Sequence, residues 1–143
     1  MCAVVTMAAT VEKDGNFDEV RAKNIFVESG VMARSIAVIS DENTLAVTLG
    51  ITDNGNGWVK TISAKGKALV ELTSTVDDKG VVMTYQPNGK KLLELSSNGN
   101  GGAIEVSNKT GEGIVQMYAD EYGNGMVYAG NRKGKGRTLE PGP

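Results

Sequence analysis

The segment GVVMTYQPNGKKLLELSSNGNGG, residues 80–102, decides the fold of this chain. Its first apolar run, Val81–Gln86, is rich in the β-branched and aromatic residues that favour strands. The turn Pro87–Lys90 follows, and its Asn-Gly pair tolerates the positive φ that a tight hairpin needs. A second apolar run covers Leu92–Leu95, and a longer polar loop, Ser96–Gly101, closes the segment. This order predicts a β-hairpin joined by a loop to the next hairpin.

The same unit recurs every 22 or 23 residues from about residue 36 to the C-terminus. The glycines that open the first strand of a unit are Gly57, Gly80, Gly102 and Gly125. The turn glycines are Gly66, Gly89, Gly111 and Gly134, and Asn43 takes this place in the first full repeat. The residues that close the second strand are Leu49, Leu72, Leu95 and Met117. A fixed period predicts supersecondary units that stack on their neighbours, and the one change of length falls in the loop before Gly102.

Alternation along the predicted strands separates two faces. One face is aliphatic, with the columns Val59, Val82, Ile104, Val127; Thr61, Thr84, Val106, Ala129; Val47, Val70, Leu93, Val115; and Leu49, Leu72, Leu95, Met117. The other face is mixed, with Thr48, Glu71, Glu94, Gln116, Ala46, Leu69, Leu92, Ile114, Trp58, Met83, Tyr85 and Tyr128. This mixed face is too apolar to be simply solvated, and we find no convincing helical segment to cover it. Another copy of the chain is the natural cover.

We therefore predict an all-β fold, a repetitive antiparallel β-meander of about ten strands packed as a trimeric β-prism. A single-chain β-solenoid and an up-and-down barrel are the alternatives, since the period suits a solenoid coil and the strand number suits a barrel. The Asn-Gly hairpins disfavour the solenoid, because they join antiparallel neighbours. The aromatic content of 5% and the two-sided apolar pattern disfavour a closed monomeric barrel.

The predicted domain occupies residues 19–130, between an N-terminal tail or edge segment, residues 1–18, and a flexible basic C-terminal tail, residues 131–143. The first two strands of the domain are Val20–Ser29 and Val31–Ser40, which align with each other at an offset of 11 residues.

The composition argues against several classes of function. The chain has 143 residues, a formal net charge of −2, no histidine and one cysteine, Cys2. Lack of histidine removes Ser-His-Asp and Cys-His nucleophile systems and Cys/His zinc sites, and a lone cysteine makes no intrachain disulfide. No run approaches the ~18 apolar residues of a membrane helix, and an acidic chain offers no field for nucleic acid. We predict no enzymatic activity, no cofactor, no nucleic-acid partner and no membrane span.

Tyr85, Asn88-Gly89-Lys90, Leu92–Leu95 and the DEYGNG segment Asp120–Gly125 form a recognisable repeat pattern. The pattern resembles a class of largely uncharacterised bacterial repeat proteins rich in glycine and asparagine, and the resemblance covers residues 36–139. More loosely, it is similar to the trimeric β-rich repeat domains of phage fibres and cell-surface proteins. The resemblance implies a structural role and an extracellular, surface or virion-associated location, and it imports no catalytic residue.

Three other features could carry chemistry. The aromatic candidates for gripping a glycan or small ligand are Trp58, Tyr85, Tyr122 and Tyr128, which fall at different places in their repeats. The Gly/Asn/Asp loops, Asp53–Gly57, Asn98–Gly102 and Asp120–Gly125, offer oxygens to calcium, although turn chemistry explains the same residues. Glu71 and Glu94 recur one repeat apart like a glycosidase pair, yet they recur where the architecture recurs, with Lys60 or Lys67 as counter-ions.

The sequence thus predicts a non-enzymatic structural or interaction module that forms a homo-oligomer. A carbohydrate- or small-ligand-binding β domain is the alternative. We expect the basic segment Asn131–Arg137 to be a solubilising end rather than a phosphate-gripping arm.

Overall fold

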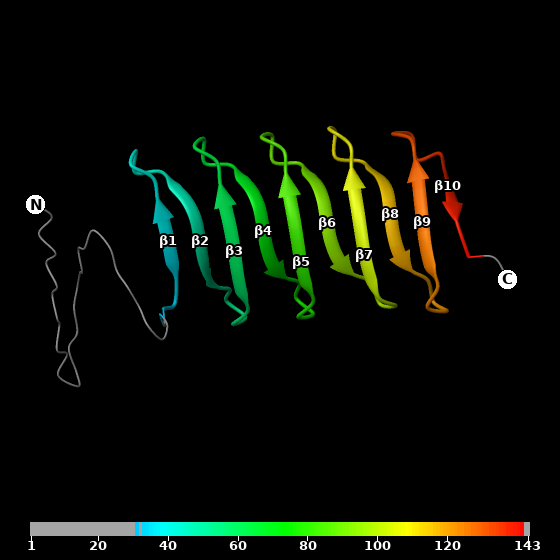
Figure 1. Ribbon diagram of the computed structural model, residues 1–143, viewed down its shortest axis with the longest axis horizontal. Coiled ribbons are helices and arrows are strands. Elements are labelled where there is room, and N and C mark those ends of the chain that lie inside the picture. The colour runs from blue at the N-terminus through cyan, green and yellow to red at the C-terminus, as the bar shows by residue number, and fades with distance from the viewer. Residues whose placement is uncertain (1–30, 32, 142–143) are drawn as a thin grey trace, which may run out of the picture. The chain divides into compact units, whose positions relative to one another are not determined.

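The computed structural model describes residue 31 and residues 33–141 of the chain. These residues form ten strands and no helix (Figure 1). The strands are β1 (Ile36–Ile39), β2 (Leu45–Ile51), β3 (Gly57–Ile62), β4 (Ala68–Ser74), β5 (Gly80–Tyr85), β6 (Lys91–Ser97), β7 (Gly102–Ser107), β8 (Gly113–Ala119), β9 (Gly125–Gly130) and β10 (Gly136–Leu139). Each strand pairs antiparallel with the next, in one sheet of order β1 to β10. The predicted antiparallel meander is confirmed.

The sheet is open, with β1 and β10 as its two edges. The barrel alternative is therefore wrong, because closing a barrel would require these two strands to pair. The solenoid alternative is also wrong, because its stacked coils give parallel neighbours, whereas all neighbours here run antiparallel through short turns.

The sheet extends further toward the C-terminus than we predicted. Strand β10 pairs with β9 through the turn Asn131–Lys135, and Leu139 lies opposite Val127. The predicted tail, residues 131–143, is thus a further hairpin as far as Leu139. Pro141 follows soon after, and its missing N–H cannot extend a ladder.

At the other end, residues 1–18 and the predicted strand Val20–Ser29 lie outside the described residues. The predicted strand Val31–Ser40 is reduced to β1, Ile36–Ile39. Ten strands are present as predicted, but they run from residue 36 to residue 139.

Eight of the nine turns have one hydrogen-bond pattern. In the turn after β5, the Gln86 amide donates to the Lys90 carbonyl (2.9 Å), and the Gly89 amide donates to the Gln86 carbonyl (2.8 Å). A three-residue hairpin loop of this kind needs a left-handed residue at its end. The left-handed residues, with φ from 58° to 91°, are Asn43, Gly55, Gly66, Asp78, Gly89, Gly111, Gly123 and Gly134. The predicted positive φ at Asn43 and the turn glycines is confirmed.

The turn between β6 and β7 is the exception. There the Asn98 amide donates to the Gly101 carbonyl (2.8 Å), which makes this turn one residue shorter than the others. The deletion seen in the sequence spacing is thus confirmed to lie in a turn. The predicted longer loop Ser96–Gly101 is wrong, because β6 continues through Ser97 and leaves only four residues between the strands.

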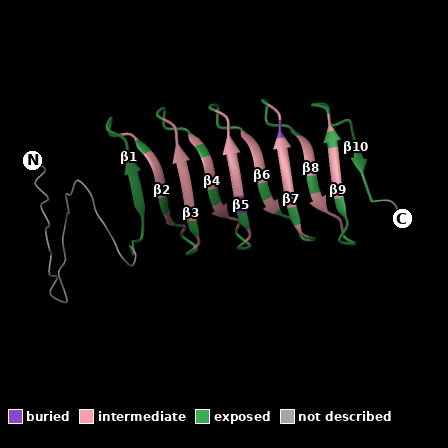
Figure 2. Ribbon diagram, in the orientation of Figure 1, coloured by how far each residue is buried: buried purple, intermediate pink, exposed green. Residues whose placement is uncertain are grey.

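The described part of the chain has almost no core of its own. Every strand packs against its sequence neighbours in a single layer. Val81, 7% exposed, and Ser107, 6% exposed, are the only described residues that are buried, and Figure 2 shows the rest as intermediate or exposed. Stable domains normally bury the apolar side of a sheet against a second layer. Residues 31 and 33–141 supply no second layer.

Candidate functional site

The strand register assembles one continuous aliphatic face. Val59 lies opposite both Leu49 and Leu72, and Val82 lies opposite both Leu72 and Leu95. The aliphatic face consists of Val47, Leu49, Val59, Thr61, Val70, Leu72, Val82, Thr84, Leu93, Leu95, Ile104, Val106, Val115, Met117, Val127 and Ala129. Each of these residues pairs only with other members or with the edge strands. The predicted membership of this face is confirmed.

One column of the aliphatic face is exposed to solvent in every repeat. Its members are 36–45% exposed and repeat with the period of the sequence: Leu49, Leu72, Leu95 and Met117. At the edge strands, Val38 is 49% exposed and Leu139 is 72% exposed. Single exposed apolar residues are common on proteins, but a contiguous apolar face marks a surface that something covers.

The opposite, mixed face carries a row of polar groups across the sheet. In register order, the row is Thr48, Lys60, Glu71, Met83, Glu94, Glu105, Gln116 and Tyr128. Lys60 Nζ lies 3.3 Å from Glu71 Oε1, and Lys91 Nζ lies 3.5 Å from Glu105 Oε1. Lys91 also pairs with Glu94. Cross-strand pairs of opposite charge stabilise antiparallel sheets modestly.

These surroundings shift the pKa values of three groups on the mixed face. The hydrogen bond from Lys91 lowers the pKa of Glu94, and the same bond raises the pKa of Lys91. Partial burial, followed by the charge of Glu71, raises the pKa of Tyr85, whose hydroxyl donates to that carboxylate at 3.1 Å. The carboxylates of Glu71 and Glu94 thus have ion-pair and hydrogen-bond partners within the sheet. Of the two counter-ions predicted for these glutamates, Lys60 pairs with Glu71, and Glu94 pairs with Lys91, which was not predicted.

Three of the four aromatic candidates lie on the mixed face. The indole of Trp58 covers Gly50, with Nε1 3.0 Å from the position a Cβ would take there, and Lys60 Nζ lies 5.7 Å from the ring centre. The ring of Tyr128 covers Gly130 in the same way. Aromatic rings placed over strand glycines support the sheet itself. Tyr85, the third, makes the bond to Glu71 described above.

Tyr122, the fourth candidate, is set apart from the other three. It lies in the turn between β8 and β9 and is 80% exposed. The candidates therefore do not form one site. We did not predict Tyr118, which lies on the mixed face opposite Ala103 and Met126. Its spacing of two residues from Gln116 was the signal that could have found it.

The loops considered for calcium use their oxygens for turn geometry. The Asp120 carboxylate accepts the amides of Tyr122 (2.9 Å) and Asn124 (2.7 Å), and the latter bond lowers its pKa. Between the turns after β2 and β4, Asn56 Nδ2 donates to Asp78 Oδ1 at 2.7 Å. Within the described residues, no group of three His, Cys, Asp or Glu side chains is placed to hold a metal ion. Turn chemistry thus accounts for these Asn and Asp residues.

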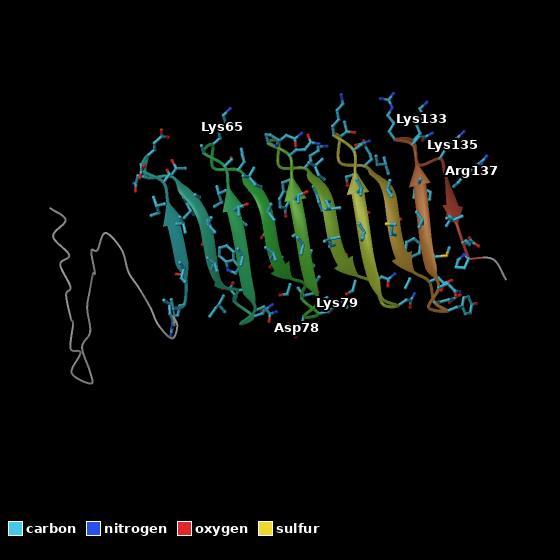
Figure 3. The ribbon with its side chains drawn as sticks, in the orientation of Figure 1. Lys65, Asp78, Lys79, Lys133, Lys135 and Arg137 are labelled. Carbon is cyan, nitrogen blue, oxygen red and sulfur yellow. The ribbon has the colours of Figure 1, made fainter. Side chains whose placement is uncertain are left out.

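The two rows of turns carry opposite charge. The turns after β1, β3, β5, β7 and β9 hold seven basic and three acidic residues. The turns after β2, β4, β6 and β8 hold five acidic residues and one basic residue. Figure 3 shows Lys65, Lys133 and Lys135 along the upper row and Asp78 and Lys79 along the lower row. The small net charge of the chain therefore conceals a separation of charge along the strand direction.

A shallow groove of about 660 Å³ is present on the aliphatic face toward its lower margin. It is lined by side chains and backbone of β6 to β9, among them Leu95, Gly102, Met117, Gly125 and Val127. The lining is largely apolar, and its polar side chains are those of Ser96 and Tyr118. Its apolar part has room for an aliphatic side chain.

No protein-family model and no curated protein matches this chain. Among the residues that the structure describes, there is no helix long and apolar enough to cross a membrane.

Proposed function

We propose that this chain is a non-enzymatic structural module that assembles with copies of itself through the aliphatic face. One observation supports this proposal most directly: the column Leu49, Leu72, Leu95 and Met117 stays 36–45% exposed on a sheet with almost no core. Burial of apolar surface is the main favourable contribution to protein association. These four side chains are partly exposed, so they would gain this contribution when another copy covers them. The remaining question is which face turns inward.

The mixed face is the better outer surface. Its carboxylates already have partners in Lys60 and Lys91, and its aromatic rings cover strand glycines. Burying these charges against another chain would cost desolvation without new partners. The aliphatic face has no charge in its central columns, so its burial incurs no such penalty.

The size of the face also fits an obligate contact. Ten strands about 4.8 Å apart make a sheet roughly 43 Å wide, and the strands β2 to β9, of six or seven residues, make it roughly 20–24 Å tall between shorter edge strands. Such a face has a footprint on the order of 900 Å², against the ~800 Å² per partner of a standard stable interface. Covering one face is therefore enough to hold copies together.

We favour three copies around a threefold axis, as a β-prism in a surface or fibre-type assembly. The number three follows from the resemblance to trimeric fibre domains. A face-to-face dimer would cover the same side chains. Light scattering at micromolar concentration should give three times the chain mass of 15.0 kDa. Twice that mass would replace the trimer by a dimer, and a monodisperse monomer would refute self-assembly.

Glycan binding is the second candidate, because Trp58, Tyr85, Tyr118 and Tyr128 share the face that this assembly leaves outward. It ranks second because two of the rings already cover glycines and Tyr85 is held by Glu71. Quenching of the single tryptophan by oligosaccharides would support this candidate. Unchanged fluorescence across a panel of neutral and acidic glycans would leave it without support.

A further inference from the structure

The chain contains two kinds of recurring glycine, and only one kind is explained by the single chain. The turn glycines have positive φ, which L-residues rarely adopt. The strand-opening glycines, Gly57, Gly80, Gly102 and Gly125, do not have positive φ. Apart from their chain neighbours, no heavy atom of the described residues lies within 4 Å of the position that a Cβ would take at any of these four. Neither backbone geometry nor internal packing therefore requires glycine there.

Glycine weakens a strand, because it adds backbone entropy and no side chain to pack. Four glycines at spacings of 23, 22 and 23 residues thus require a reason outside the single sheet. A close approach by another chain is such a reason, since glycine in a strand often marks a place where a second backbone or side chain comes near.

The strand-opening glycines lie on the aliphatic face, beside its most exposed column. Gly80 opens β5 opposite Ser74, two residues along β4 from Leu72. Gly102 lies opposite Ser97 and Gly125 opposite Ala119, at the same distance from Leu95 and Met117. These small residues leave the groove of about 660 Å³ along this margin. The face therefore presents protruding aliphatic side chains and, at Gly102 and Gly125, an adjacent hollow. In the first repeat Gly57 lies opposite Ile51, which is 56% exposed.

We infer that the groove at Gly102 and Gly125 receives the protruding side chains of Leu95 and Met117 from a second copy of the chain. This inference rests on the proposed self-assembly and specifies how the copies pack. A side chain larger than hydrogen at Gly102 or Gly125 would fill this groove and keep the second copy out of it. The rows of glycines and of protruding side chains have the same period, and the groove lies at the last two of these glycines. Association then depends on the glycines, whereas the fold of one chain does not.

The test replaces Gly102 and Gly125 together by valine, and Gly99 by valine as a matched control. Gly99 also has no positive φ and open space around its Cβ position, but it lies in the turn between β6 and β7. We expect the double variant to raise the concentration at which the assembly dissociates at least tenfold. Gly99→Val should dissociate at the wild-type concentration. Far-UV circular dichroism should show β structure in all three proteins.

A cross-linking experiment measures the contact directly and does not depend on the valine variants. In a Cys2→Ser background, mixed Gly102→Cys and Met117→Cys chains should form a mixed disulfide on oxidation with oxidised glutathione. Gly99→Cys mixed with Met117→Cys should form far less. An assembled wild type with unchanged dissociation of the double variant and equal cross-linking of both mixtures would overturn the groove contact and leave self-assembly standing. A monomeric wild type would overturn both proposals.

Discussion

The two faces of this sheet differ in how many of their side chains find contacts within one chain. On the mixed face, the side chain of Glu71 is 21% exposed and has Lys60 and Tyr85 as partners. On the aliphatic face, the adjacent residue Leu72 is 45% exposed. A single sheet can pair charges between neighbouring strands, but it cannot cover a row of aliphatic side chains without a second layer. The difference teaches that the polar side chains here find partners within one sheet, whereas the aliphatic side chains have no second layer among the described residues.

Two methionines on opposite faces give the strongest test of this comparison. Met117 is 45% exposed on the aliphatic face, and Met83 lies between Glu71 and Glu94 on the mixed face. Met117→Lys should abolish assembly, because it would bury an unpaired charge between copies. Met83→Lys should leave assembly intact, since two carboxylates flank it. Sedimentation velocity of both variants measures the result, and the opposite ranking would mean that the mixed face is the inner one.

Truncation on the two faces should differ by several kcal/mol in the assembled protein. We expect Leu72→Ala or Leu95→Ala to destabilise by roughly 2–5 kcal/mol once the column is buried between copies. Glu71→Ala and Glu94→Ala should each change stability by under about 1 kcal/mol. Unfolding by denaturant measures these values, at protein concentrations well above the concentration at which the assembly dissociates. Silent leucine variants together with severe glutamate variants would invert the assignment of faces.

Substitutions in the turns should change the stability of the chain independently of either face. Gly89 has φ 84°, and Asn43 fills the equivalent position with φ 58°. Gly89→Val should therefore destabilise by well over about 1 kcal/mol, and Gly89→Asn by much less. Equal melting temperatures for the two variants would remove the backbone explanation for these glycines. The loss should persist when the protein is diluted, because it arises within one hairpin.

The smallest effect should come from pH, through the mixed face alone. The pKa of Glu94 lies below its usual value of 4.5, so the folded chain binds fewer protons than the unfolded chain near that pH. The stability that this carboxylate contributes is complete above about pH 4.5 and is lost as the pH falls through its folded-state pKa. Melting temperatures from pH 6 to pH 3 should fall less in Glu94→Gln than in the wild type. Parallel curves would show that the pair with Lys91 contributes nothing.

The repeat in the sequence was enough to predict strands, turns and faces, because each follows from local spacing. Leu72 and Val82 share a face by alternation, and Asn43 takes a left-handed turn position for the same reason as Gly89. The exposed fraction of each side chain could not be predicted from spacing, since it depends on whether a second layer covers the sheet. The partner of Glu94 was missed for a geometric reason. A β-bulge at Thr84/Tyr85 shifts the register. Lys91 therefore lies on the mixed face with Glu94, although simple alternation from Leu93 predicts the aliphatic face for it.

Strand β10 was missed because Gly136–Leu139 contains only one aliphatic residue, so its apolar pattern is weak. What places the strand is the turn before it, in which the Gly134 amide donates to the Asn131 carbonyl (2.9 Å) as in the other hairpins. Tyr118 was not predicted, although its alternation with Gln116 within β8 places it on the mixed face.

The nearest-neighbour order of the sheet determines how one chain yields to force. The two edges, β1 and β10, lie at opposite ends of the strand order, so tension applied between them is directed across the strands. In that direction the ladder hydrogen bonds are loaded one pair after another, as in a zipper, and not all together as in shear. Each hairpin that opens releases 22 or 23 residues, or roughly 75–80 Å of extended chain. One chain is therefore an extensible element with a regular step, and in the assembly proposed above the copies on its aliphatic face would stiffen it.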